Sequence, residues 1–322
     1  MPDLVPAPVR GVMAMLLLAV NTLWWALLLM AIAAVKFALP LRPVRRRVDP
    51  VLNALATAWI ACNGVILWPR RRTTWDVRGD TGLQRGEWYM VTSNHQTWVD
   101  IFVLQRTLSG RIPLLKFFLK QQLIWVPVIG PAWWALDFPF MGRYGKAALR
   151  RNPGLRLKDR EATRRACAKF ELVPTSVMTF PEGTRMTPDK HAAQPQPYRH
   201  LLRPKAGSLA MSLHVMGGRF RSLLDVTVVY PDGVPTFWDL LCGRCRRVVV
   251  RLRQIEITPE LRGDYTEDPA FRRRFHRWLD TIWQDKDRQI ESLLGAAAPA
   301  EPLTPDASGP APPENTRSSR SR

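Results

Sequence analysis

The feature that most constrains this chain is an uncharged run near its N-terminus, from Gly11 to Val35. As an α-helix rising about 1.5 Å per residue, such a run is long enough to cross a hydrocarbon core of roughly 30 Å. It is longer than the apolar part of a signal peptide, and no small-x-small cleavage site lies ahead of the basic cluster that follows. We therefore predict a transmembrane helix over residues 11–35.

The charges that flank this run are unequal. Arg10 precedes it. Five basic residues follow it closely, namely Lys36, Arg42, Arg45, Arg46 and Arg47. Because cytoplasmic segments next to a span carry an excess of Lys and Arg, we expect the rest of the chain to face the cytoplasm from an inner membrane. Residues 1–10 would then lie on the far side.

A second apolar run extends from Val51 to Trp68 and is interrupted by Asn53 and Asn63. Arginine clusters lie on both sides of it, which favours an interfacial or re-entrant helix at residues 51–68. A full second crossing is the alternative. Residues 1–72 are thus expected to form an N-terminal membrane-anchoring segment.

From Trp75 onward the sequence alternates between strand and helix patterns. Apolar and β-branched runs predict strands at residues 88–92, 175–180, 223–230 and 248–257. Amphipathic patterns predict helices at residues 158–170 and after Pro269. The expected fold class is α/β, a mixed β-sheet flanked by helices, over residues 73–295. The tail at 296–322, rich in Ala, Pro and Ser, is expected to be disordered.

The net charge of the chain limits the classes of partner that it is expected to bind. With 47 Lys and Arg against 27 Asp and Glu, the formal net charge is +20, which favours nucleic acid, anionic lipid or an acidic carrier protein. The basic residues come in short clusters among Trp-rich apolar stretches, and this suits a membrane surface better than nucleic acid. A basic surface that is simply solvated is the alternative. Four cysteines, including the pair Cys242 and Cys245, complete neither a disulfide framework nor a zinc site, so no metal is expected.

The first candidate site is the sequence NHQTWVD at residues 94–100, directly after a predicted strand. If His95 lies on the loop and Thr97 opens a helix, Asp100 falls in the first helical turn. Its carboxylate can then hold the imidazole at Nδ1 and leave Nε2 to accept a proton as a general base. The spacing of Thr97 and Asp100 fits a helix capping box equally well.

The second candidate site is the sequence FPEGTR at residues 180–185, also at the end of a predicted strand. Gly183 lets backbone N–H groups approach an anion closely, and Arg185 can bind a phosphate through two nitrogens. An ordinary turn built around Pro181 and Gly183 is the alternative.

Together the two motifs resemble the glycerolipid acyltransferase family, whose type member acylates 1-acylglycerol-3-phosphate. That family combines a His-x-x-x-x-Asp motif with a Pro-Glu-Gly-Thr-Arg motif, and here the second follows the first by about 85 residues. Residues 119–143 between them resemble the family's second block, and more specifically that of a bacterial inner-membrane branch. The resemblance covers roughly residues 10–290.

The resemblance implies a role for each matching residue. His95 is the general base and Asp100 is the acid that orients it. The residues implied to bind the phosphate and glycerol of the acceptor are Arg143, Glu182, Gly183, Thr184, Arg185 and Lys205. Thr97 stands where the family usually has Ser, and it keeps the hydroxyl.

The implied activity is transfer of a fatty acyl group from acyl-carrier protein or acyl-CoA to the sn-2 hydroxyl of a lysophospholipid, in phospholipid biosynthesis or remodelling. Membrane lipids are further expected partners, and no cofactor is implied. No Gly-x-Ser-x-Gly sequence is present to supply an acyl-enzyme nucleophile. Two alternatives stay open: a membrane-bound lipid hydrolase that activates water with the same His–Asp pair, and a nucleic-acid-binding membrane protein, suggested by the charge alone.

Overall fold

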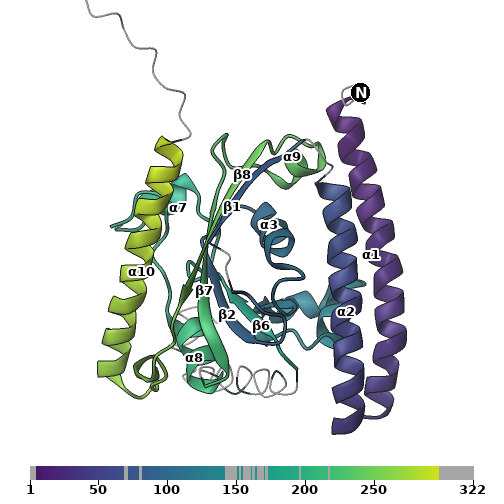
Figure 1. The fold of residues 1–322 in the computed structure, drawn as a ribbon, viewed down its shortest axis with the longest axis horizontal. Helices are drawn as coiled ribbons and strands as arrows, with labels where there is room; N and C mark the ends of the chain where they lie inside the picture. Colours follow the sequence, from purple (N-terminus) through teal and green to yellow (C-terminus); the bar gives the residue numbers. More distant parts are fainter. Residues whose placement is uncertain are drawn as a thin grey trace, which may run out of the picture.

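The computed structural model describes residues 5–68, 72–79, 82–141, 173–195, 197–216 and 218–296, together with positions 151, 154, 161, 164 and 170. Arg143, most of the predicted helix at 158–170 and the tail beyond residue 296 lie outside the described residues. A central sheet lies between helices on its two faces, and a helical hairpin packs at one side (Figure 1).

Six strands form the central sheet, in the order β1-β8-β7-β2-β6-β3. They are β1 Thr74–Arg78, β2 Trp88–Ser93, β3 Leu115–Phe117, β6 Ser176–Thr179, β7 Phe220–Val229 and β8 Arg247–Ile255. Strands β7, β2, β6 and β3 run parallel, whereas β8 is antiparallel to β7 and parallel to β1. The expected mixed α/β sheet is confirmed. The sequence pattern does not predict β1 and β3, because TWDVR and LKF are short and lack a run of β-branched residues.

Helices cover both faces of this sheet. α3 (Val99–Leu108) and α9 (Phe237–Leu241) lie on the side of the hairpin, and α8 (Gly207–Met216) and α10 (Pro269–Gly295) lie on the other (Figure 1). α10 buries one apolar stripe against the sheet, as its sequence pattern predicts. The remaining short elements are β4 Leu119–Lys120, β5 Phe140–Met141, α4 Ile129–Ala135, α7 Pro188–Ala192 and the 3-10 turns Gln121–Trp125 and Pro259–Leu261.

The hairpin consists of α1 (Ala7–Ala38) and α2 (Arg42–Leu67), which pack side by side (Figure 1). Both are long and apolar enough to cross a bilayer. α2 starts at Arg42 rather than at the beginning of the apolar run, and it continues through Pro50. The two helices share a polar contact, because the amide of Asn21 donates to the side-chain oxygen of Asn63 over 2.9 Å. Asn63, one of the two asparagines that interrupt the second apolar run, is thus hydrogen-bonded to the other helix of the hairpin.

The outer face of α1 is an exposed apolar stripe. Its exposed residues recur at helical spacing and include Val9, Met13, Leu16, Val20, Trp24 and Leu27. The opposite face of α1 is covered by the rest of the chain and carries small or apolar buried residues such as Ala26, Leu29 and Ala33. A stripe of this length in contact with water would be costly, so a lipid surface is its natural cover.

Both ends of α1 contact the sheet domain. Near the N-terminus, the guanidinium of Arg10 donates to the carbonyl oxygen of Cys242 at 3.1 and 3.2 Å. Near the C-terminus, the ring of Phe37 stacks on Trp134 with centroids 4.3 Å apart. A helix that crossed the bilayer alone would hold these ends on opposite sides. The crossing at residues 11–35 stays a prediction.

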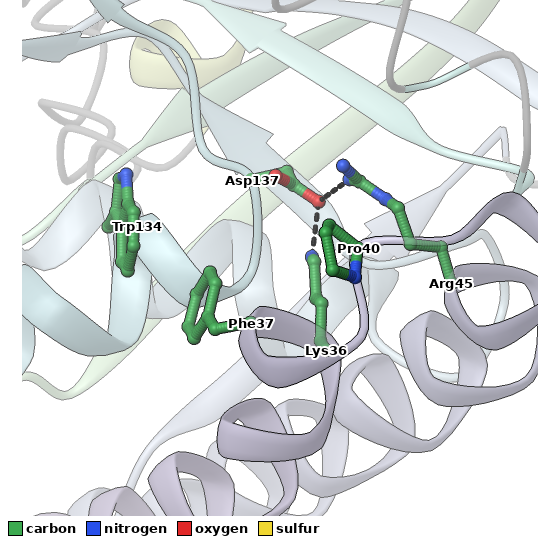
Figure 2. A pocket seen from close by; sticks show the side chains of 6 residues that line it. All are labelled: Lys36, Phe37, Pro40, Arg45, Trp134 and Asp137. Carbon is green, nitrogen blue, oxygen red and sulfur yellow. Dashed lines mark hydrogen bonds and ion pairs between the residues drawn. The ribbon is translucent and has the colours of Figure 1, made fainter.

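An ionic cluster attaches the hairpin to α4 (Figure 2). Lys36 Nζ lies 2.5 Å from Asp137 Oδ2 and 2.8 Å from Asp49 Oδ1, and Arg45 reaches Asp137 Oδ2 at 2.7 Å. Lys36, Arg45 and Asp137 border a pocket of about 120 Å³ together with Phe37, Pro40 and Trp134. A neighbouring pocket is lined by both Asp137 and Thr175, just before β6. The cluster thus lies near the start of β6, whereas the FPEGTR motif follows the end of that strand.

Candidate active site

The end of β2 is fixed to β7 by an asparagine side chain. Asn94 Nδ2 donates to the carbonyl oxygen of Val228 at 2.8 Å, and its Oδ1 accepts from the N–H of Val228 at 2.9 Å. The Asn94 side chain thus bonds the backbone of β7 just beyond the last residue of β2, where backbone groups would otherwise make the contact. The result is that His95 leaves the sheet at the carboxyl ends of the parallel strands, on a rigid support.

His95 and Asp100 form the expected pair. Nδ1 of His95 lies 2.9 Å from Oδ2 of Asp100, which is buried at the start of α3. The same oxygen accepts the backbone N–H groups of Gln96 at 2.6 Å and Thr97 at 2.9 Å. Asp100 therefore holds both the imidazole and the backbone turn that leads into α3, whereas no side chain caps α3 at its N-cap residue, Trp98. Within the described chain, Nε2 of His95 has no hydrogen-bond partner.

The second motif packs directly on this pair. The ring of Phe180 stacks on the imidazole of His95 with centroids 3.9 Å apart and an angle of 13°. The backbone N–H of Met186 donates to the carbonyl oxygen of His95 at 2.7 Å. Because β2 and β6 are neighbours and run parallel, the loops after them meet, and the tertiary structure brings the two sequence motifs together.

Glu182 is turned into the protein, with 1% of its surface exposed. Its Oε1 accepts the backbone N–H of His95 at 2.9 Å, and its Oε2 accepts that of Leu202 at 3.2 Å. Burial raises the pKa of Glu182 to about 8, although the two backbone donors oppose this rise. The carboxyl group of Glu182 therefore holds the backbone of the loop that carries His95. Contact between Glu182 and the substrate stays a prediction.

Gly183, Thr184 and Arg185 of the second motif are exposed or partly exposed. Gly183 adopts a positive φ of 70°, a conformation that favours glycine, and an added Cβ there would come within 3.2 Å of Lys205 Nζ. Lys190 Nζ donates to the hydroxyl of Thr184 at 2.8 Å. The exposed guanidinium of Arg185 lies over the exposed ring of Trp98, 5.0 Å from its centroid. Cationic side chains and a backbone turn thus lie together at the surface of the loop that packs on His95.

One residue that contacts this pair has no counterpart in the sequence analysis. Tyr230, directly after β7, donates its hydroxyl to Oδ1 of Asp100 at 2.7 Å. Its signal in the sequence is weak: a tyrosine that ends the apolar strand LLDVTVVY reads as part of the core. Arg143, predicted to bind the acceptor, lies outside the described residues. Among the described residues, no group of three metal-binding side chains occurs.

The sequence model of the acyltransferase family matches residues 74–231. Over these residues the chain matches the acyltransferase family. The matched range begins at β1 and ends just after Tyr230, so it contains both motifs and Tyr230 itself. The resemblance found in the sequence is confirmed, and the protein is an acyltransferase.

Other acyltransferases are similar to this chain over most of its length. The human 1-acyl-sn-glycerol-3-phosphate acyltransferase delta is 24% identical over 288 residues, which cover 84% of this chain and 71% of the human protein. The mouse gamma enzyme of the same name is 23% identical over 216 residues, covering 62% of this chain and 52% of that protein. Among solved structures, the 1-acyl-sn-glycerophosphate acyltransferase of Thermotoga maritima has a TM-score of 0.46 and 18% identity, covering 86% of this chain and 97% of the other.

Proposed function

We propose that this acyltransferase moves a fatty acyl group from a thioester donor to the sn-2 hydroxyl of 1-acylglycerol-3-phosphate or a related lysophospholipid. The donor is acyl-carrier protein or acyl-CoA. The observation that carries the proposal is the His95–Asp100 pair, held 2.9 Å apart at the end of β2 with Nε2 unpartnered within the described residues. The names of the relatives, which act on 1-acyl-sn-glycerol-3-phosphate, support this acceptor.

The proposed reaction is direct transfer. Nε2 of His95 takes the proton of the acceptor hydroxyl while that oxygen attacks the thioester carbonyl carbon. A carbon–oxygen bond forms, the carbon–sulfur bond then breaks, and the proton on Nε2 passes to the departing thiolate. Asp100 keeps the imidazole in the tautomer that leaves Nε2 free, and it stabilises the imidazolium between the two steps. Protons and charges balance with no co-reactant.

The acceptor phosphate would bind beside the imidazole. Arg185 presents a planar guanidinium there, and Lys205 adds a second cation next to Gly183. The positive φ of Gly183 turns the backbone of the loop away from the standard conformations and leaves room for an anion. Thr184 supplies a hydroxyl, and Arg143 stays a further predicted contact.

The apolar stripe on α1 indicates how the enzyme meets its lipid substrates. Since both ends of α1 contact the sheet domain, we propose that the hairpin lies along one membrane surface with the stripe in the lipid, and that this surface is the cytoplasmic face of an inner membrane. The three arginines exposed near the start of α2, Arg42, Arg46 and Arg47, would meet anionic headgroups.

The test uses the purified full-length chain in detergent with 1-oleoyl-glycerol-3-phosphate as acceptor. Palmitoyl-CoA and palmitoyl-acyl-carrier protein are offered separately as donors, and phosphatidic acid is the product measured. His95→Ala is expected to lower kcat by about 10²–10⁴-fold, because nothing else nearby accepts the proton. His214→Ala, an exposed histidine on α8, is the matched control and should retain activity. Release of free palmitate without acceptor, at the rate seen with acceptor, would indicate a hydrolase and contradict the proposal.

A further inference from the structure

Tyr230 and Asp100 form a buried contact that the sequence motifs do not include. The hydroxyl of Tyr230 lies 2.7 Å from Oδ1 of Asp100, and the two residues are 4% and 1% exposed. We propose that Tyr230 is a positioning residue for acyl transfer, which acts on His95 through the carboxylate of Asp100. The inference rests on the proposed function of the His95–Asp100 pair.

The two oxygens of Asp100 have different tasks. Oδ2 accepts from the His95 ring and from two backbone N–H groups, whereas Oδ1 has the Tyr230 hydroxyl as its partner in the described part of the chain. A carboxylate with donors on one oxygen alone can still tilt about that oxygen. With Tyr230 on Oδ1, both oxygens are fixed, and the plane of the carboxylate is set relative to the imidazole.

The donor and acceptor of this bond come from separate elements. Asp100 belongs to α3, while Tyr230 follows β7, whose end is joined to the His95 loop through Asn94 and Val228. The Tyr230 ring lies in the same hydrophobic cluster as Val99. Both partners are therefore held by packing that does not depend on the bond itself, and the hydroxyl is placed in advance.

The hydroxyl of Tyr230 can act as the hydrogen-bond donor that Oδ1 of Asp100 requires. An ionised carboxylate only accepts hydrogen bonds, so the tyrosine must donate. Burial and the neighbouring charge of Asp100 raise the pKa of Tyr230 well above its usual value, so the proton stays on the phenol at every pH at which the enzyme works. A donor on Oδ1 spreads the negative charge over the carboxylate and lessens the charge that faces the imidazole.

Removal of that donor has two consequences for the reaction. The carboxylate loses a fixed orientation, which lowers kcat. More of its negative charge also faces His95, which favours the protonated imidazole, and only the unprotonated ring acts as a base. The acid limb of the pH–rate profile must therefore move to higher pH. Among the described residues, the other titratable groups that interact with Asp100 or Tyr230 are Glu182, from the loop after β6, and Cys245, between α9 and β8.

The experiment compares Tyr230→Phe with the full-length wild type in the transfer assay, between about pH 5 and pH 8.5. Tyr89→Phe is the matched control: Tyr89 is fully buried in the same cluster, and its hydroxyl accepts the N–H of Gln84 at 2.9 Å, away from Asp100. We expect Tyr230→Phe to lower kcat about tenfold, to leave both KM values within about twofold, and to move the acid limb up by about half a pH unit. Tyr89→Phe should leave the limb where it is in the wild type.

A lower kcat with an unmoved acid limb would give Tyr230 a structural role alone and overturn the inference, as would an equal shift in Tyr89→Phe. A double variant guards against loss of folding. In the Asp100→Asn background the change at Tyr230 should cost less than twofold, and a full tenfold cost there would also overturn the inference. If the wild type itself transfers no acyl group, the proposed function fails. If it transfers and Tyr230→Phe matches it in every respect, only this inference fails.

Discussion

The guanidinium of Arg10 donates two hydrogen bonds to the carbonyl oxygen of Cys242, which is 232 residues further along the chain. Next to it, a Cβ added to Gly11 would come within 2.8 Å of the sulfur of Cys242 and 2.9 Å of the Trp238 ring, so α1 and α9 are in close contact. We therefore propose that the N-terminal end of α1 and the domain that carries the His95–Asp100 pair lie on the same side of the membrane.

This contact leads to a topological prediction. In a cysteine-free background, single cysteines at position 5 and at position 72 should show the same accessibility to a membrane-impermeant thiol reagent on intact spheroplasts. We expect both to be protected until the cells are opened. Labelling at position 5 with protection at position 72 would instead support a crossing by residues 11–35.

The buried carboxyl of Glu182 predicts how stability depends on pH. Because its pKa is raised from 4.5 in the unfolded chain to about 8, the folded state holds a proton that the unfolded state has lost between these values. Its stabilising contribution is present below about pH 4.5 and is lost as the pH rises through 8. The melting temperature of Glu182→Gln in detergent should therefore change less between pH 5 and pH 8 than that of the wild type. Glu256→Gln, an exposed control, should follow the wild type.

Arg185 predicts a specific kinetic change. Arg185→Lys keeps the positive charge but loses the planar fork that binds phosphate through two nitrogens and lies over Trp98. The KM for 1-oleoyl-glycerol-3-phosphate should rise about tenfold, with a smaller loss of kcat. Arg277→Lys on the exposed face of α10 should leave both constants unchanged. A rise in the KM for the donor instead would place Arg185 at the other substrate.

The ionic cluster at the hairpin predicts a coupled effect on stability. Lys36→Met removes the cation that lies between the buried carboxylates of Asp49 and Asp137, although Arg45 still contacts both. Loss of one partner from a buried pair typically costs about 3–5 kcal/mol, so the melting temperature should fall by several degrees.

The partner variant provides the control for this effect. Lys36→Met combined with Asp137→Asn should recover part of the loss, since one uncompensated charge is then removed and asparagine tolerates the positive φ of 57° at this position. Equal melting temperatures for the single and the double variant would show that the two residues are not coupled.

Much of this protein follows from local patterns. The strand runs at 88–92, 175–180, 223–230 and 248–257 and the amphipathic helix after Pro269 are correctly predicted, because alternation and helical spacing report directly on burial. The pairing of His95 with Asp100 also follows from five residues of separation, since a loop that enters a helix brings these positions together within one turn.

The sequence alone therefore determined β2, β6, β7, β8 and α10, the His–Asp pair and the resemblance to the family. Only the tertiary structure decided which groups surround that pair. Glu182 reaches the backbone of His95 across 87 residues, and Tyr230 reaches Asp100 across 130. The tertiary structure also shows that both ends of α1 contact the rest of the chain, whereas the charges that flank α1 predict a membrane crossing. Contacts between distant positions depend on which strands become neighbours, and hydrophobic periodicity specifies burial without specifying the neighbour.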